Sequence, residues 1–341
     1  MKVKRIYLQL LIIAGVLVTV FFISRMRIHG EYVSLSGFTQ GTTYHITYES
    51  KNGKNIQASV DSLLADFDMS LSIYKPSSII SRFNRNEPGT KTDSKFRTVF
   101  KKSFEVYKNT DGAFDITVGP IVNALGFGNK DTLDVDSKII DSLLMYVGME
   151  KVQLSADSLV KQNPNVTLDV NALAQGFSVD VVVAFLEGMK IRNYLVEIGG
   201  EVRARGHNEN NQVWRIGIDR PVEGNFLPGE NLQAIIMLDN HSLATSGNYR
   251  KYYEKNGIKY VHTINPKTGY PVVSNLLSAT VVAGDCMTAD AYATALMVFG
   301  VERSVQFLNQ QNFLDAYLIF SDAKGKFQVY STPGMKKYIT N

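Results

Sequence analysis

Apolar residues recur along the chain with two different periods, and each period predicts its own kind of element. Tyr44, Ile46 and Tyr48 alternate with polar residues, which indicates a strand with one buried face. Over residues 56–67 the apolar positions instead fall three or four apart, the spacing of one face of a helix. The stretch 72–90 that follows is polar and rich in turn residues, so we expect a long loop there.

Capping residues and glycines predict where further helices begin and end. Asp93 is placed to cap a helix that runs to Tyr107, and a second helix is expected from Asp136 to Tyr146, before Gly148. Residues 171–189 predict a further helix. Strands are expected at 151–154, 165–169, 194–198, 201–205, 214–218, 233–238, 259–264 and 278–282.

The run of strands joined by short turns predicts antiparallel sheets with helices on one side, an α+β fold. The loop 221–230 holds two prolines and two glycines and is the best candidate for a domain boundary. Because it lies between two expected strands, we interpret it as an extended hairpin connection. The organisation that we expect is an N-terminal segment over 1–30 and one domain over 31–341.

Charge and composition exclude one class of function. Hydrophobic residues make up 45% and charged residues 20% of the 341 positions, as in ordinary folded proteins. The formal charge of +4 has its source in the first thirty residues, which hold five basic and no acidic side chains. The remainder carries 31 basic against 32 acidic residues. A basic stripe that tracks a nucleic acid is therefore not expected.

Residues 6–23 form a run without charge, about 27 Å long as a helix and just able to span a bilayer. Three basic residues precede the run and two follow it, which favours a cytoplasmic N-terminus. The expected location is the inner membrane, with the bulk of the chain on the periplasmic, extracytoplasmic side. A cleaved signal peptide is the alternative, but no small-x-small site follows Ile23 and no cysteine lies near to take a lipid.

Several familiar motifs are missing from the sequence. It contains no Walker A, HExxH or CxxC motif, and Cys286 is the sole cysteine, best interpreted as a small buried apolar residue. Gly199 and Gly200 stand between two expected strands, whereas a dinucleotide fingerprint requires a strand followed by a helix. The glycine pair allows close backbone approach, either to a neighbouring strand, which the spacing favours, or to a ligand.

The segment 262–300 combines a base with a site for a hard cation. His262 titrates near neutrality in its ordinary state and precedes a Pro-Lys-Thr-Gly turn. Asp290 and Thr294 are four apart and share one face of an expected helix. One carboxylate with one hydroxyl suits Mg²⁺, which keeps waters and takes substrate phosphates as ligands. The alternatives are a structural histidine in a strand and a solvated helix face, although the alanines around Asp290 favour a ligand packed closely.

Seven blocks of sequence resemble, in order, the motifs of the ApbE family, the FAD:protein FMN transferases. The last is the segment HTINPKTG at 262–269 with the helix MTADAYATA at 287–295. Any one block is a weak signal, but seven in register over some 260 residues are specific. The other six are GTTYHITY (41–48), LSIYKPSSIISRFN (71–84), GAFDITVGPIVNALGFG (112–128), LDVNALAQGFSVD (168–180), NYLVEIGGEVRARG (193–206) and SLATSGNYRKYY (242–253).

The resemblance implies a flavin transferase domain over 31–341 that moves FMN from FAD to a threonine of an acceptor protein and releases AMP. In the family the acceptors are flavoprotein subunits of membrane electron-transfer complexes. The resemblance places Mg²⁺ on Asp290, Thr294 and the carbonyl of Ala172, and makes His262 the catalytic base. The positions that match the family's FAD contacts are Gln40, Tyr74, Ala113, Phe114, Asp115, Asp169, Gln175 and Ile264.

These FAD contacts have plainer alternatives. Tyr74 is suited to stacking on a ring or to anchoring a loop, and Asp115 and Asp169 to binding ligand donors or to capping a turn or helix. Two positions depart from the family, since many members have Met in place of Gln40 and Lys in place of Gln175. Because Mg²⁺ supplies positive charge by itself, we expect these changes to tune FAD affinity.

Two rival functions use the same site. Water in place of threonine would give an FAD pyrophosphatase that releases FMN and AMP, and a site without chemistry would give a periplasmic FAD-binding protein. The presence of His262 with Asp290 and Thr294 disfavours pure binding, which needs no base. Transferase and hydrolase differ in water exclusion and acceptor docking, and the residues leave that choice open.

Overall fold

The computed structural model describes residues 30–127, 136–155, 157–222, 229–247, 252–255, 258–261 and 263–340. The apolar run 6–23 lies outside these residues, so the expectation of an anchor or signal segment stays a prediction. Within the described ranges, no helix has the length and apolar character that crossing a bilayer requires.

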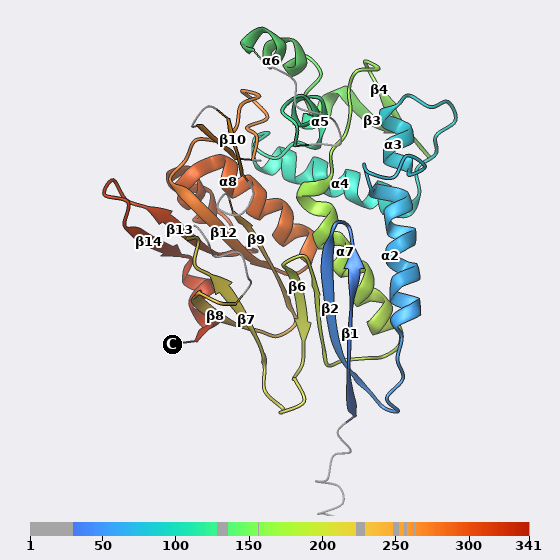
Figure 1. Ribbon diagram of the computed structural model, residues 1–341, viewed down its shortest axis with the longest axis vertical. Coiled ribbons are helices and arrows are strands. Elements are labelled where there is room, and N and C mark those ends of the chain that lie inside the picture. Colours follow the sequence, from blue (N-terminus) through green and yellow to red (C-terminus); the bar gives the residue numbers. More distant parts are fainter. Residues whose placement is uncertain are drawn as a thin grey trace, which may run out of the picture.

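An eight-stranded sheet forms the centre of the molecule (Figure 1), and every described pairing in it is antiparallel. Strand β2 alternates buried and more exposed residues, so one of its faces buries Tyr44, Ile46 and Tyr48 completely or nearly so. In spatial order the strands are β1 (Glu31–Thr39), β2 (Thr42–Ser50), β5 (Tyr194–Ile198), β6 (Glu201–Arg205), β9 (His241–Gly247), β12 (Leu276–Ala283), β13 (Asp315–Ser321) and β14 (Phe327–Ser331).

Helices cover one face of this sheet, with α7 and α8 packed against it and α2 outside α7 (Figure 1). Two apolar clusters fill the space between these layers. Side chains of α7 and α2 pack on β2 and β5, and those of α8 pack on β12 and β13. The described helices are α2 (Gln57–Leu71), α3 (Ile79–Asn84), α4 (Ser94–Asn109), α5 (Gly119–Ala124), α6 (Ser137–Leu144), α7 (Asn171–Gly188) and α8 (Cys286–Leu308), with short 3₁₀ turns η1 (Ile116–Val118), η2 (Met149–Lys151) and η3 (Pro333–Lys337).

A smaller sheet covers the opposite face. Trp214, Ile236 and Leu238 of this sheet pack on Leu243 and Ile319 of the large one. The connection 221–230 joins two of its strands that pair with each other, as expected for a hairpin connection. This sheet consists of β7 (Trp214–Asp219), β8 (Leu232–Leu238) and β15 (Ile339–Thr340), and two hairpins stand apart, β3 (Val152–Ser155) with β4 (Ser158–Lys161) and β10 (Tyr252–Lys255) with β11 (Ile258–Val261).

The predicted α+β class is confirmed, and most predicted elements lie within a residue or two of their expected bounds. Two predictions are wrong. The stretch 72–90 contains the helix α3, which is too short to show a periodic pattern. Residues 165–169 form no strand, because β4 (Ser158–Lys161) pairs with β3 instead and the backbone of Leu168 pairs with a side chain of α3.

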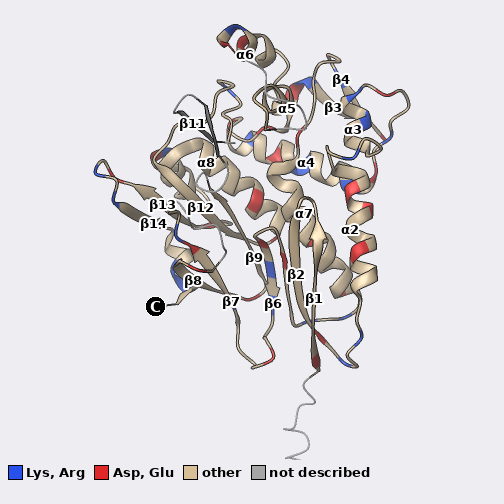
Figure 2. Ribbon diagram, viewed as in Figure 1, with Lys and Arg blue, Asp and Glu red and all other residues tan. Residues whose placement is uncertain are grey.

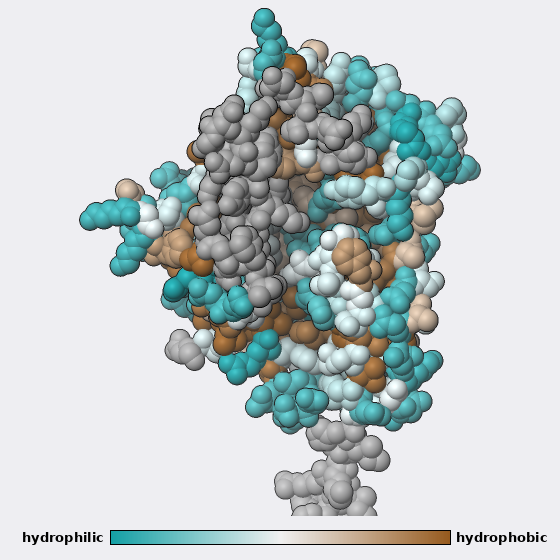
Figure 3. All heavy atoms as spheres, in the orientation of Figure 1, coloured by the Kyte–Doolittle hydropathy of each residue, from teal (hydrophilic) through white to brown (hydrophobic). Residues whose placement is uncertain are grey.

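Lys and Arg residues and Asp and Glu residues are both distributed over the described helices, strands and loops (Figure 2), in agreement with the neutral balance expected after residue 30. Hydrophilic residues cover most of the periphery of the face in Figure 3, and apolar atoms reach the surface between them. Among the large apolar side chains that are well exposed are Phe38 (75%) and Tyr74 (59%). Both lie in or beside segments that the sequence assigns to the flavin site.

Candidate active site

Two helices from distant parts of the sequence meet at Gly176. A β-carbon at this position would lie 2.8 Å from Cβ of Asp290, so only glycine lets α7 approach α8 this closely. The amide of Gly176 donates to Oδ2 of Asp290 at 3.0 Å. In a regular helix this amide faces the carbonyl of Ala172, four residues earlier. The contact therefore lies one helical turn after Ala172, the residue whose carbonyl is a predicted metal ligand.

The carboxylate of Asp290 is buried, and a backbone amide donates a hydrogen bond to it. Its side chain belongs to a residue that is 6% exposed, so it does not form the solvated helix face considered as an alternative. Burial raises its pKa, the Gly176 hydrogen bond lowers it, and the nearby Asp180 raises it further. Among the described side chains, no Lys or Arg pairs with it. A carboxylate in such surroundings takes up either a proton or a metal cation.

Thr294 lies one turn further along α8 and forms a 3.3 Å contact between its Oγ1 and Oγ of Ser246 on β9. Of the three predicted ligands, Ala172 lies on α7 and Asp290 and Thr294 lie on α8, and these two helices contact each other at Gly176 and Asp290. No group of three or more His, Cys, Asp or Glu side chains suited to a metal occurs in the described part of the chain. The set offers instead one carboxylate, one hydroxyl and one carbonyl, the sparse donor set that Mg²⁺ accepts.

Asp180 on α7 is a functional residue that our sequence reasoning missed. Its Oδ1 accepts the amide of Cys286 and its Oδ2 the amide of Met287, both at 2.8 Å, so a side chain of one helix caps the start of the other. Burial raises its pKa to about 7 against the effect of these two hydrogen bonds. The one available signal is its spacing four residues after Gly176, which places both on one face of α7.

Cys286 itself behaves as predicted. It is fully buried, its Sγ lies 3.6 Å from the carbonyl oxygen of Val202, and burial raises the pKa of the thiol well above its usual range. A thiolate nucleophile is not available here.

Two hairpin turns lie side by side at one end of the sheet, because β2 pairs with β5. Gln40 and Gly41 connect β1 to β2 with φ of 52° and 75°, while Gly199 and Gly200 connect β5 to β6 with φ of 64° and 110°. Both are two-residue turns of the kind that favours Gly and Asn. The Gly199 amide donates to the Thr43 carbonyl at 3.1 Å.

Two glutamine side chains lie at these turns, that of Gln40 in the first turn and that of Gln175, which reaches the second turn from α7. The side-chain nitrogen of Gln175 fills the space where a β-carbon of Gly199 would stand. The absence of a side chain at Gly199 therefore lets its backbone lie close both to the neighbouring strand β2 and to the side chain of Gln175. Oε1 of Gln40 accepts from Oγ of Ser178 on α7 at 3.4 Å. Its Nε2 is buried and has no partner in the described structure. A buried hydrogen-bond donor without a partner lowers the stability of the folded protein, and an acceptor atom of a ligand bound here would give this donor a partner.

Asp115 borders a second part of the site. Its Oδ1 accepts the amide of Thr117 at 2.7 Å and caps η1, so the capping alternative is correct, but Oδ2 makes none of these bonds. Burial raises its pKa to about 6. Ala113 and Phe114 before it are buried. A cavity of about 470 Å³ lies alongside, lined among others by Tyr107, Asp111, Asp115, Gly148, Glu150 and Lys267.

Ile264 lies close to the same cavity. It is 7% exposed and packs with Ile121, Ile140 and Val147, while its backbone forms a bridge to Pro271. His262, the predicted base, falls outside the residues that the structure describes, so its role stays a prediction. The expected strand 259–264 is present as β11 up to Val261.

Tyr74 and Asp169 meet although 95 positions separate them. Asp169 is buried, and its Oδ1 accepts the amide of Asn171 at 2.9 Å at the start of α7. Burial raises the pKa of the Tyr74 hydroxyl, the charge of Asp169 raises it further, and a hydrogen bond with Asn171 lowers it. The ring of Tyr74 nevertheless stays largely exposed, so it is not a buried packing anchor. An aromatic face open to solvent beside a carboxylate suits a bound ring system.

Comparisons with known proteins agree with the sequence motifs. A sequence model described as the ApbE family matches residues 40–318. The FAD:protein FMN transferase of Vibrio cholerae is 36% identical, over 91% of this chain and 93% of its own length. That of Haemophilus influenzae is 35% identical, over 96% and 97% respectively.

Solved structures show the same likeness in three dimensions. The flavin transferase ApbE from Vibrio cholerae superimposes with a TM-score of 0.80 at 36% identity, covering 90% of this chain and 99% of that one. The apo form of the flavinyl transferase ApbE from Pseudomonas stutzeri also gives a TM-score of 0.80, at 29% identity, covering 91% and 98%.

Proposed function

The chain belongs to the ApbE family, and from this premise we propose that it transfers the FMN part of FAD to an acceptor protein. The observation that carries the proposal is the α7–α8 contact, where the amide of Gly176 on α7 donates to the buried carboxylate of Asp290 on α8. Its relatives named FAD:protein FMN transferase cover nearly the whole chain, so the likeness is not confined to one motif.

We propose that Asp290, Thr294 and the carbonyl of Ala172 hold Mg²⁺. The fit rests on the carboxylate of Asp290, which is buried and has no cationic partner among the described side chains, so that a bound cation would offset its negative charge. When bound, Mg²⁺ would neutralise charge on the pyrophosphate of FAD. Gly176 contributes by donating its amide to Oδ2, which fixes the orientation of the carboxylate.

For the chemistry, we propose that His262 accepts the proton of an acceptor threonine hydroxyl. The threonine oxygen then forms a bond to the phosphorus on the riboflavin side, and the bond from this phosphorus to the bridging oxygen breaks. AMP leaves with the bridging oxygen and its electron pair. The orphaned Nε2 of Gln40 and the exposed ring of Tyr74 are suited to bind and orient FAD. Asp115, Asp169, Gln175 and Ile264 complete the proposed binding face.

The direct test is mass spectrometry of a flavoprotein acceptor after incubation with this protein, FAD and Mg²⁺. We expect the acceptor to gain the mass of FMN on a threonine, and AMP to appear in equal amount. Release of free FMN with AMP and an unmodified acceptor would mean that the protein is a hydrolase. FAD that binds and stays intact would mean a binding protein.

We also propose that residues 6–23 anchor the protein in the inner membrane with the enzyme on the periplasmic side, where membrane-linked acceptor subunits would be within reach. The support is the uncharged run and the basic residues before it. Fractionation should recover the full-length chain with membranes, and protease added from outside the membrane should degrade it. A soluble mature chain that begins near Glu31 would show cleavage instead.

A further inference from the structure

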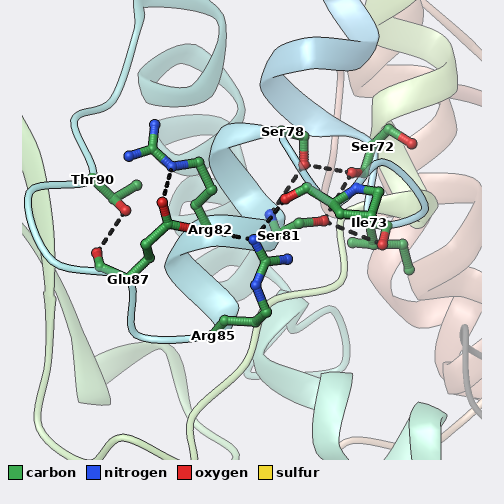
Figure 4. Close-up of polar contacts among 9 residues, drawn as sticks. Ser72, Ile73, Ser78, Ser81, Arg82, Arg85, Glu87 and Thr90 are labelled. Carbon is green, nitrogen blue, oxygen red and sulfur yellow. Dashed lines mark hydrogen bonds and ion pairs between the residues drawn. The ribbon is translucent and has the colours of Figure 1, made fainter.

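Helix α3 contains none of the predicted flavin contacts, yet it binds the loop that carries Tyr74. Oγ of Ser78, the residue that caps the helix, donates to the carbonyl of Ser72 at 2.7 Å (Figure 4). Oγ of Ser81 lies 3.2 Å from the carbonyls of both Ser72 and Ile73. These bonds fix the backbone on the N-terminal side of Tyr74.

The far side of the same loop is held by a guanidinium group. Nη2 of Arg85 donates to the carbonyl of Pro76 at 2.7 Å. Glu87 accepts from Arg85 at 3.2 Å and from Nε of Arg82 at 2.9 Å, which orients the Arg85 side chain (Figure 4). The loop around Tyr74 is therefore attached to α3 on both sides.

The last residue of α3 binds a second segment of the site. Nδ2 of Asn84 donates to the carbonyl of Leu168 at 2.9 Å, and Oδ1 accepts the Leu168 amide at 2.8 Å. One carboxamide thus satisfies both backbone groups of the residue before Asp169, as a neighbouring strand would do. The next amide, that of Asp169, donates to the carbonyl of Ile116 at 2.7 Å.

Lys161 keeps Asn84 itself in place. Its ammonium group donates to the carbonyl of Val166 at 2.7 Å and lies 3.5 Å from the carbonyl of Asn84. It also stands 4.6 Å from the ring centre of Phe83. The helix end and the segment before Asp169 are therefore tied together by a side chain from β4 as well as by Asn84.

From this arrangement we propose that Asn84 is a positioning residue that aligns Asp169 with Tyr74 for FAD binding. The inference rests on the proposed function, since it concerns the face that would bind FAD. Asn84 fixes Leu168, and hence Asp169 and the start of α7, while the hydroxyls of Ser78 and Ser81 fix the Tyr74 loop to the same short helix. A face whose two halves are already aligned loses less entropy when a ligand binds.

The test compares Asn84→Ala with Asn275→Ala in the full-length protein. Asn275 is a matched control because its Nδ2 also bonds a backbone carbonyl, that of Ser321 at 2.9 Å, at the edge of β12. FAD affinity is measured by quenching of flavin fluorescence, and amide hydrogen exchange over 166–171 is measured without FAD. We expect Asn84→Ala to bind FAD roughly tenfold more weakly, to raise KM for FAD more than it lowers kcat, and to exchange faster at Leu168 and Asp169. Asn275→Ala should match the wild type in all three.

A double-mutant cycle separates positioning from general destabilisation. If Asn84 acts through Asp169, then Asn84→Ala should weaken FAD binding less than about threefold when introduced into Asp169→Ala. Full additivity of the two substitutions, or an affinity of Asn84→Ala equal to that of Asn275→Ala, would overturn the inference. If Asn84→Ala does not fold, Asn84→Asp replaces it, since a carboxylate keeps the bond from the Leu168 amide and loses only the donor. Wild-type protein that binds FAD but modifies no acceptor would reject the proposed function and leave the inference intact.

Discussion

The α7–α8 contact and the loops around Tyr74 are held in place by different means. In the first, carboxylates that burial keeps from water accept backbone amides, as Asp180 does from Cys286 and Met287 and Asp290 does from Gly176. In the second, the side chains of α3 donate to loop carbonyls while the ring of Tyr74 stays 59% exposed. One region holds buried carboxylates in a tight helix contact, and the other presents an open face.

This difference separates two tasks. A cation site needs few ligands at fixed positions, and the close approach of α7 to α8 lets the Gly176 amide orient the Asp290 carboxylate. A site for a large ligand needs extended surface, and hairpin turns and loops supply it. Substitutions at the α7–α8 contact should therefore affect turnover and metal dependence, whereas those near Tyr74 should affect FAD affinity.

The largest effect is expected at Asp290. Asp290→Asn keeps an oxygen for the Gly176 amide and removes the charge, so the fold should survive while Mg²⁺-dependent transfer falls by on the order of 10³-fold. Because a buried carboxylate is costly, the metal-free variant should melt at or above the temperature of the wild type at pH 8. Asp290→Ala should lose transfer likewise. Steady-state rates against Mg²⁺ concentration test this, and unchanged Mg²⁺ dependence would remove Asp290 from the metal site.

His262 tests whether chemistry and flavin binding are separable. If it takes the threonine proton, His262→Ala should bind FAD normally and transfer FMN about 10²-fold more slowly. A structural histidine would behave differently, since its loss would lower thermal stability and FAD affinity together. FAD titration beside single-turnover rates at saturating FAD distinguishes the two. Weakened binding with an unchanged rate would exclude the catalytic role.

Local patterns predicted the helical part of the site well. The spacing of Asp290 and Thr294 is a property of five consecutive residues, and the structure confirms that they lie in one helix, α8. β5 and β6 match their predicted bounds because alternation and a glycine pair define a hairpin without reference to the rest of the chain.

What the sequence could not predict depends on partners far apart in the chain. Asp180 caps a helix that begins more than one hundred residues later. The pattern of residues 165–169 is typical of a strand, but the backbone of Leu168 forms its hydrogen bonds with the side chain of Asn84. Helix α3 has six residues, fewer than two turns, so no period could appear. Such contacts follow from the tertiary arrangement, and apart from the spacing of Asp180 from Gly176 the sequence pattern carries no signal for them.

The smallest effect concerns the pH dependence of stability through Asp180. Burial raises the folded-state pKa of this group from 3.8 to about 7, so between about pH 4 and 7 the unfolded chain has released a proton that the folded protein retains. The free energy of unfolding without metal should therefore fall as pH rises across this window, by at most about 1.4 kcal/mol per pH unit for this group, and level off above it. Asp180→Asn should flatten this slope. The control Asp136→Asn, which changes an exposed helix cap, should not. Urea denaturation at pH 5 and pH 8 in EDTA measures the slopes, and an equal slope in wild type and Asp180→Asn would contradict the assignment.

Saturating Mg²⁺ should stabilise the wild type more at pH 8 than at pH 5, because the cation binds only the ionised form of Asp290.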